Sequence, residues 1–108
     1  MQIHDFPIER YKTRFKEYYK KLENKENIFY IFFTSDLLYV FLKCLSFIPE
    51  TVNIVCIASN LREEEKKWLA SNVKQDVFLI DELCDDRDIW EILFATNQNS
   101  FGWLDVDC

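Results

Sequence analysis

The feature of this sequence that most limits its fold is a hydrophobic period that switches repeatedly between strand-like and helix-like. Strand-like runs, rich in β-branched and aromatic residues, cover 28–33, 52–58, 77–80 and 101–107. Helical spacing occupies 37–48 and 61–73, and a third helix carries its stripe on Ile89, Trp90, Leu93 and Phe94. This alternation predicts an α/β fold, a three-layer αβα Rossmann-like arrangement around a mainly parallel sheet of about four strands.

A further helix is predicted before the first strand. Pro7 stands where a helix can begin, and the helix is expected to reach about Asn24. Its apolar stripe consists of Ile8, Tyr11, Phe15, Tyr18 and Leu22. We therefore divide the chain into an N-terminal amphipathic helix, residues 1–27, and an α/β unit, residues 28–108.

The helix at 61–73 has both a start signal and an inner face in the sequence. Asn60, with Glu63 three residues later, indicates a capping box. The inner stripe is expected to consist of Leu61, Trp68, Leu69 and Val73.

The charge pattern disfavours nucleic acid as a partner. The formal net charge is −6, and the basic residues alternate with glutamates in segments such as "LREEEKKWL" instead of forming a stripe. This pattern is typical of a solvated helix face. Hydrophobic residues make up 49% of the chain, which is too much for a disordered segment of that charge.

Cysteine usage and hydropathy indicate a cytoplasmic protein without a transmembrane segment. The four cysteines form no CxxC pair, and His4 is the only histidine, so we expect reduced, buried thiols and no zinc site. The N-terminus lacks the apolar core of a signal peptide. The 21 residues at 28–48 are mostly apolar, but Asp36 and Lys43 interrupt them, and "TSD" reads as a turn between a strand and a helix.

Polar residues follow each predicted strand. In a parallel sheet the carboxyl ends of the strands share one edge, where ligands bind. Ordinary surface turns are also polar, so this pattern alone leaves both interpretations open. The residues concerned are Thr34, Ser35 and Asp36; Ser59 and Asn60; Asp81 and Glu82; and Asp105 and Asp107.

Glycine content narrows the range of ligands. Gly102 is the only glycine, so the chain has neither a GxGxxG run nor a P-loop to close its backbone on phosphates. A bound diphosphate would need another source of positive charge. Asp105 and Asp107 could hold a hard divalent cation, Mg²⁺ or Mn²⁺, that carries the phosphates.

The final segment, "FGWLDVDC", resembles the DxD region of GT-A-fold glycosyltransferases, and residues 28–108 resemble the nucleotide-binding half that precedes this motif. The resemblance implies a divalent metal, a nucleotide-diphospho-sugar donor and an acceptor of unknown identity. It implies that Asp107 binds the metal and that Asp105 contacts ribose or metal. "TSD", with Thr34, Ser35 and Asp36, and the "SN" pair with Asn60 match positions around the nucleoside.

The resemblance also implies an acceptor half downstream of the motif, and this chain has none. We therefore expect a fragment, a truncated form or a degenerate copy that is inactive alone. A non-catalytic flavodoxin-like or receiver-like interaction domain is an alternative. A haloacid dehalogenase-like phosphohydrolase is another, although in that family Asp-x-Asp opens the fold and is followed by Gly-Thr.

Overall fold

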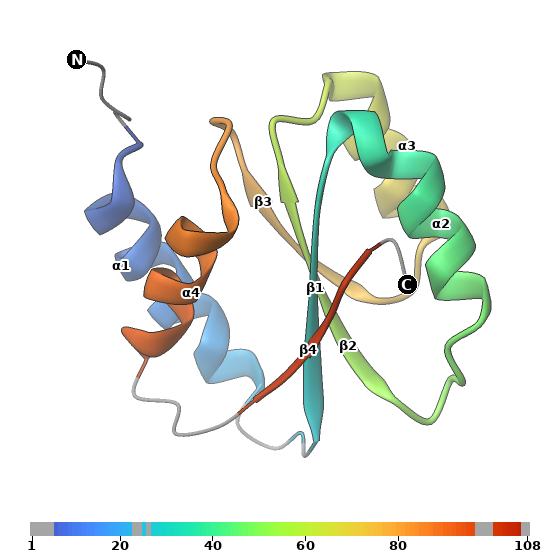
Figure 1. Ribbon diagram of the computed structural model, residues 1–108, viewed down its shortest axis with the longest axis horizontal. Coiled ribbons are helices and arrows are strands. Elements are labelled where there is room, and N and C mark those ends of the chain that lie inside the picture. The colour runs from blue at the N-terminus through green and yellow to red at the C-terminus, as the bar shows by residue number, and fades with distance from the viewer. Residues whose placement is uncertain (1–5, 23–24, 26, 97–100, 107–108) are drawn as a thin grey trace.

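The computed structural model describes residues 6–22, 25, 27–96 and 101–106, and these form one α/β unit (Figure 1). The helices are α1 (Ile8–Tyr19), α2 (Leu38–Ser46), α3 (Glu63–Asn72) and α4 (Asp86–Phe94), with short 3₁₀ turns at Lys20–Leu22 and Ser35–Leu37. The strands are β1 (Ile28–Thr34), β2 (Asn53–Ser59), β3 (Asp76–Ile80) and β4 (Gly102–Leu104).

The strands form one parallel sheet in the order β3-β2-β1-β4. β1 lies in the centre, where Tyr30 is paired with Val55 of β2 on one side and with Trp103 of β4 on the other. Central strands are covered on both faces, which explains the continuous apolar runs in β1 and β2. The α/β prediction with a parallel four-stranded sheet is confirmed.

The helices cover both faces of the sheet, α1 and α4 on one and α2 and α3 on the other (Figure 1). Successive residues of β1 therefore enter different cores. Tyr30 belongs to the core under α1 and α4, whereas Ile31 and Phe33 belong to the core under α2 and α3. On the second face, the rings of Phe33 and Phe41 stack with centroids 3.9 Å apart.

Helix α1 belongs to the same core as the sheet. Tyr11 and Phe15 are fully buried, and the ring of Phe15 meets that of Phe78 edge-on with centroids 5.1 Å apart. α1 lies beside α4 and shields the β2–β3 half of this face. Burying two large aromatic side chains contributes several kcal/mol, which fixes this helix to the sheet.

Two local predictions for α3 are wrong. The helix begins at Glu63 with Arg62 as its N-cap, so the capping carboxylate is Glu65, while Asn60 lies outside the helix with a positive φ of 59°. Trp68 is 45% exposed. The buried residues of α3 are Glu65 and Leu69, which lie one above the other on the same face. Trp68 precedes Leu69 by one position and is therefore rotated about 100° around the helix axis, away from the core.

Two further findings concern the thiols and the membrane. Cys44, Cys56 and Cys84 are buried thiols, as expected, and burial raises the pKa of Cys56 to about 12. Cys108 lies outside the described residues. Within the described part of the chain, no helix is both long enough and apolar enough to cross a bilayer.

Candidate functional site

Because every strand pair is parallel, the residues that follow the four strands share one edge, as predicted. From β1 the chain proceeds outward to β2 and β3 through α2 and α3, and then returns through α4, on the other face, to β4. The connection that leaves β1 turns toward β2, whereas the connection through α4 passes β1 on the other face and enters β4 on its far side. The strand order therefore reverses between β1 and β4, which is a topological switch point of the sheet.

A pocket of about 390 Å³ lies at this switch point. Its polar lining includes the carboxylates of Asp86, in the first turn of α4, and Asp105, which directly follows β4. None of the described residues that line the pocket is Lys or Arg. Its apolar and aromatic lining residues are Phe32, Leu37, Trp103, Leu104 and Val106.

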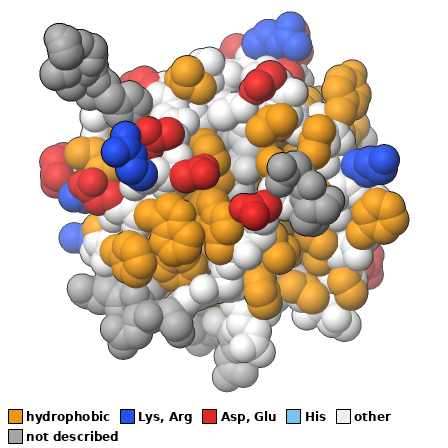
Figure 2. All heavy atoms as spheres, viewed as in Figure 1, with side chains coloured by type: hydrophobic (Ala, Val, Ile, Leu, Met, Phe, Trp, Pro, Cys, Tyr) orange, Lys and Arg blue, Asp and Glu red, His pale blue; other side chains and the backbone are white. Residues whose placement is uncertain are grey.

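Strand β4 is held in place by aromatic packing against α4. The ring of Trp90 lies 5.0 Å from that of Trp103 and 5.1 Å from that of Phe101, centroid to centroid. Hydrophobic side chains gather over this part of the surface, around α4 and β4 (Figure 2). Trp103 Nε1 also donates to Asp105 Oδ1 at 3.3 Å, so the packed indole helps to orient the exposed carboxylate.

The loop after β1 is tied to α3. Ser35 Oγ donates to Glu65 Oε1 at 2.8 Å, and the backbone N–H of Arg62 donates to the same oxygen at 2.8 Å. The Arg62 N–H and then the Ser35 hydroxyl lower the pKa of Glu65, so this buried side chain stays ionised at neutral pH. Thr34 Oγ1 donates to the carboxylate of Asp36 within the loop. These bonds fix the segment that leads to Leu37 at the pocket.

The ends of β2 and β3 form a separate hydrogen-bonded structure. Ser59 is fully buried; its Oγ donates to the backbone carbonyl of Glu82 at 2.6 Å and accepts from the backbone N–H of Cys84 at 3.1 Å. The Tyr11 hydroxyl accepts from the backbone N–H of Asp81 at 3.0 Å and donates to the carboxylate of Glu82. Asn60 is exposed and its backbone N–H donates to Ile80 O at 2.9 Å.

The predicted site residues therefore occupy different places on one edge. Asp105 lines the pocket, and Thr34, Ser35 and Asp36 form the loop that ends there at Leu37. Asn60 follows the next strand and does not line the pocket. Asp107 lies outside the described residues.

Sequence reasoning missed two residues of this edge. Asp86 is not among the predicted site residues, although an aspartate in the first helical turn after an N-cap, here Asp85, is a recognisable signal. Glu65 lies in the segment "LREEEKKWL", whose charge pattern predicts a solvated helix face. Its position three residues after the true N-cap was the available signal.

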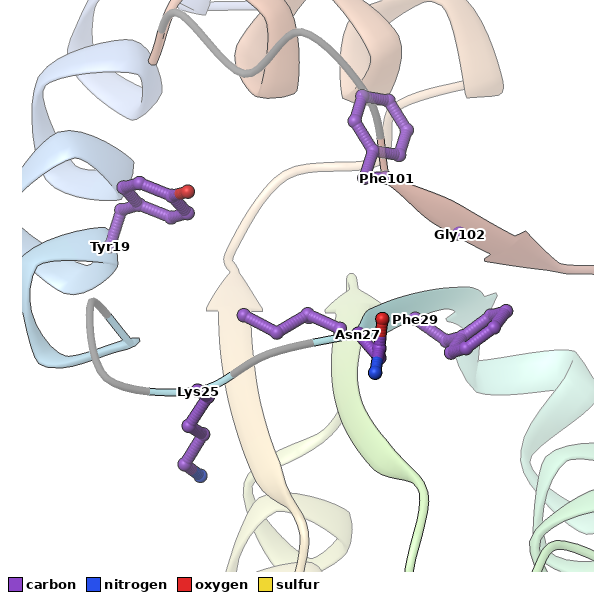
Figure 3. Close-up of a pocket in the computed structure, with 7 residues that line it drawn as sticks. Tyr19, Lys25, Asn27, Phe29, Phe101 and Gly102 are labelled. Carbon is purple, nitrogen blue, oxygen red and sulfur yellow. The ribbon is translucent and has the colours of Figure 1, made fainter.

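A second pocket lies at the opposite edge, where β1 and β4 begin (Figure 3). It has a volume of about 350 Å³ and is lined by residues that include Tyr19, Asn27 and Phe101. Lys25, which also lines it, pairs with Asp76 at 3.0 Å. Ligands of open α/β sheets bind at the carboxyl edge, so we assign the candidate site to the pocket at Asp105.

No group of three or more His, Cys, Asp or Glu side chains placed to hold a metal ion occurs among the residues that the structure describes. The pocket does present two carboxylates, Asp86 and Asp105, which are ligands of the type that hard divalent cations prefer. The chemistry of these two donors fits Mg²⁺ or Mn²⁺, which would need further oxygen ligands.

A parallel sheet of this order, layered between helices and open at its carboxyl edge, defines a Rossmann-like α/β domain that can bind a ligand at its switch point. Within that class, the chain belongs to the family of StrH glycosyltransferase N-terminal domains, whose family model matches residues 8–108.

A relative in Streptomyces griseus, the dTDP-dihydrostreptose–streptidine-6-phosphate dihydrostreptosyltransferase, is 33% identical to this chain over 106 residues. The alignment covers 96% of this chain and 27% of the relative, so the chain spans about a quarter of that protein's length. No solved structure matches the chain.

Proposed function

We propose that this chain is the nucleotide-sugar-binding portion of a metal-dependent glycosyltransferase, and that it binds the nucleoside diphosphate of its donor at the pocket between β1 and β4. The observation that carries the proposal is the position of Asp105, directly after β4 at the switch point of the sheet. Membership in a glycosyltransferase N-terminal domain family supports it, as does the resemblance of "LDVD" to a GT-A DxD motif.

The charge of the pocket supports a requirement for metal. A diphosphate would approach Asp86 and Asp105, two carboxylates with no Lys or Arg among the described lining residues, in a protein with a net charge of −6. Like charges in a partly desolvated site repel strongly. A divalent cation held by Asp105 and by Asp107, which lies outside the described residues, would neutralise both the carboxylates and the diphosphate.

The chain's own residues then bind and orient the donor. Phe32 and Leu37 provide an apolar wall that can exclude water from one face of a nucleoside. Thr34, Ser35 and Asp36 form a loop that the bonds to Glu65 hold in one conformation before ligand arrives, which reduces the entropy lost on binding. Asp105 would contact ribose or metal.

The name of the relative narrows the choice of donor to be tested first. That protein is named for a dTDP-linked sugar, so we propose a nucleoside diphosphate such as dTDP as the ligand of this chain. The chain matches about a quarter of the relative, so the proposal concerns donor binding and does not extend to the acceptor or to the transfer reaction.

Isothermal titration calorimetry with dTDP tests the proposal. We expect binding in the presence of Mn²⁺ and at least about tenfold weaker binding in EDTA, and dTDP should tighten Mn²⁺ binding by the same factor. Asp105→Asn should abolish the effect of metal. Asp81→Asn is the matched control, because Asp81 is an exposed carboxylate on the same edge that does not line the pocket.

Equal affinity for dTDP with Mn²⁺ and with EDTA would refute the metal-dependent site. So would a loss of metal-dependent binding in Asp81→Asn that equals the loss in Asp105→Asn, because the effect would then be one of general charge. In either case the non-catalytic interpretation of the domain would be favoured.

A further inference from the structure

The outer edge of β3 is open. Among the described strands β3 pairs only with β2, and its Ile80 carbonyl accepts from Asn60 on that side. Backbone groups alternate in direction along a strand, so those of Val77 and Leu79 point away from the sheet. The Leu79 carbonyl accepts from a side chain instead of a strand, Arg14 Nη2 at 3.4 Å.

Two grooves flank this edge, one on each face of the sheet. The α1-side groove has a volume of about 540 Å³ and lies between α1 and β3. The α3-side groove has a volume of about 270 Å³ and is lined in part by Leu69, Ala70 and Val73. Both grooves include Val77 and Leu79. An added strand would therefore send alternate side chains into the two grooves.

The two grooves differ in chemistry. The α3-side groove is mainly apolar, whereas α1 contributes Arg14, Lys21 and Glu17 to the other. Arg14 lies over the rings of Tyr11 and Phe78, 5.0 and 5.7 Å from their centroids, and forms no ion pair with a described carboxylate. This groove thus has a net positive charge in a protein whose net charge is −6.

The α1-side groove also holds an unsatisfied donor. The hydroxyl of Tyr18 is inaccessible to solvent and has no hydrogen-bond partner among the described residues. A buried polar group without a partner destabilises a protein, and such groups in native structures call for an explanation. Burial raises the pKa of this hydroxyl, so it remains a donor across the physiological range.

We propose that the open edge of β3 binds an extended acidic peptide segment of another polypeptide, which adds a strand to the sheet. Its backbone pairs with Val77 and Leu79. Its apolar side chains enter the α3-side groove, and its alternating carboxylates meet Arg14 and Lys21 in the α1-side groove. This is recognition by strand addition, in which the backbone provides affinity and alternate side chains provide specificity.

A second copy of this chain fits the edge less well. Two β3 edges paired antiparallel about a twofold axis would bring the two α1 helices side by side on one face of the joined sheet. The two α1-side grooves, each with two cations, Arg14 and Lys21, against one carboxylate, Glu17, would then face each other with net charge of the same sign. The β3 edge is also remote from the pocket at β4, so peptide binding requires neither nucleotide nor metal.

The probe is a fluorescently labelled, end-capped heptapeptide, Thr-Val-Glu-Val-Glu-Val-Thr, titrated with the 108-residue chain and followed by anisotropy. We expect saturable one-to-one binding that weakens as salt is added. A peptide with Lys in place of Glu, and one with N-methyl groups on alternate backbone nitrogens, should not bind. Both controls keep the length and the valines, so they separate charge and backbone pairing from hydrophobic adsorption.

Protein variants test the assigned residues. Lys21→Glu should weaken binding by about fivefold or more, whereas Lys43→Glu, the same charge change at an exposed position on α2, should leave it within about twofold. Bound peptide should slow amide hydrogen exchange at Val77 and Leu79 and leave Phe78, which already faces β2, unchanged. This alternation would not arise from nonspecific binding.

Three outcomes would overturn the proposal. The first is equal binding of the Glu and Lys peptides. The second is protection that spreads evenly over 76–80. The third is that Arg14→Glu dimerises and the wild-type chain does not bind the peptide. Arg14 would then serve only to prevent two β3 edges from pairing.

Discussion

Gly102 provides a direct test of how β4 is positioned. It is paired with Phe29 of β1, and the ring of Phe29 lies over the space that a side chain at Gly102 would fill (both are labelled in Figure 3). A Cβ at this position would lie 2.2 Å from Cδ2 and 2.7 Å from Cγ of Phe29. Carbon atoms in contact are normally about 3.5–4.0 Å apart. Gly102→Ala therefore forces the ring or the strand to move by about 1 Å.

We expect Gly102→Ala to lower the free energy of unfolding by about 1–3 kcal/mol, the usual range for overpacking. The sign of the change is informative, because replacing a glycine by alanine at an unstrained position normally raises the free energy of unfolding by about 0.4–1 kcal/mol. Gly102 has no positive φ, so backbone strain does not explain the glycine. Urea unfolding followed by tryptophan fluorescence measures the change, with an unchanged m-value as the check that only stability differs.

A double-mutant cycle with Phe29→Ala identifies the cause. Phe29→Ala removes the ring, so Gly102→Ala in that background should leave the free energy of unfolding unchanged or raise it. This corresponds to a coupling energy of at least about 1 kcal/mol between the two positions. An alanine that is tolerated at position 102 while Phe29 is intact would refute the register between β1 and β4. The placement of Asp105 beside the end of β1 would then be refuted as well.

Two further variants test the polar groups described above. Glu65→Gln should destabilise the fold by about 1–2 kcal/mol at pH 7, because charged hydrogen bonds to Ser35 and Arg62 are weakened, while the exposed Glu64→Gln should change it by less than about 0.5 kcal/mol. The pKa of Glu65 is lower in the folded than in the unfolded state, so the ionised side chain stabilises the fold above the unfolded pKa of about 4.3 and this stabilisation is lost as the pH falls through the folded pKa. The difference in free energy of unfolding between Glu65→Gln and wild type should therefore disappear at low pH. A difference that stays constant with pH in urea titrations would contradict this. Tyr18→Phe should raise the melting temperature, because it removes a buried hydroxyl without a hydrogen-bond partner among the described residues. Tyr19→Phe is the control and should leave the melting temperature nearly unchanged. A lower melting temperature for Tyr18→Phe would show that the hydroxyl has a partner.

The sheet could be predicted from the sequence because its determinants are local. Residues 28–33 form a run of large apolar side chains that only a strand covered on both faces can bury, and the structure shows Tyr30 and Ile31 fully buried on opposite faces. Alternation with helices then implied parallel pairing, and parallel pairing implied one edge for all the strand ends.

The rotation of α3 and the makeup of the pocket could not be predicted in the same way, because they depend on distant contacts. Glu65 faces inward because Ser35, thirty positions earlier, offers it a hydroxyl. Tyr11 is buried in the core, where its hydroxyl accepts a hydrogen bond from the backbone N–H of Asp81, seventy positions away. Asp86 lines the pocket only because α4 crosses back to β4, which requires the strand order to be known.

Two pairs of carboxylates at this edge differ in their partners. Glu65 and Glu82 accept several hydrogen bonds, their pKa values are lowered, and each joins elements far apart in the chain. Asp86 and Asp105 line the pocket without an ion pair to any described Lys or Arg. Asp86 lies in the first turn of α4, where a carboxylate is favourable, and Asp105 accepts a hydrogen bond from Trp103 Nε1, so both side chains leave carboxylate oxygens available to a ligand. A cation bound at these oxygens would attract a diphosphate. Asp86 and Asp105, rather than the bonded Glu65 and Glu82, are therefore the carboxylates that we propose give the domain affinity for a charged donor.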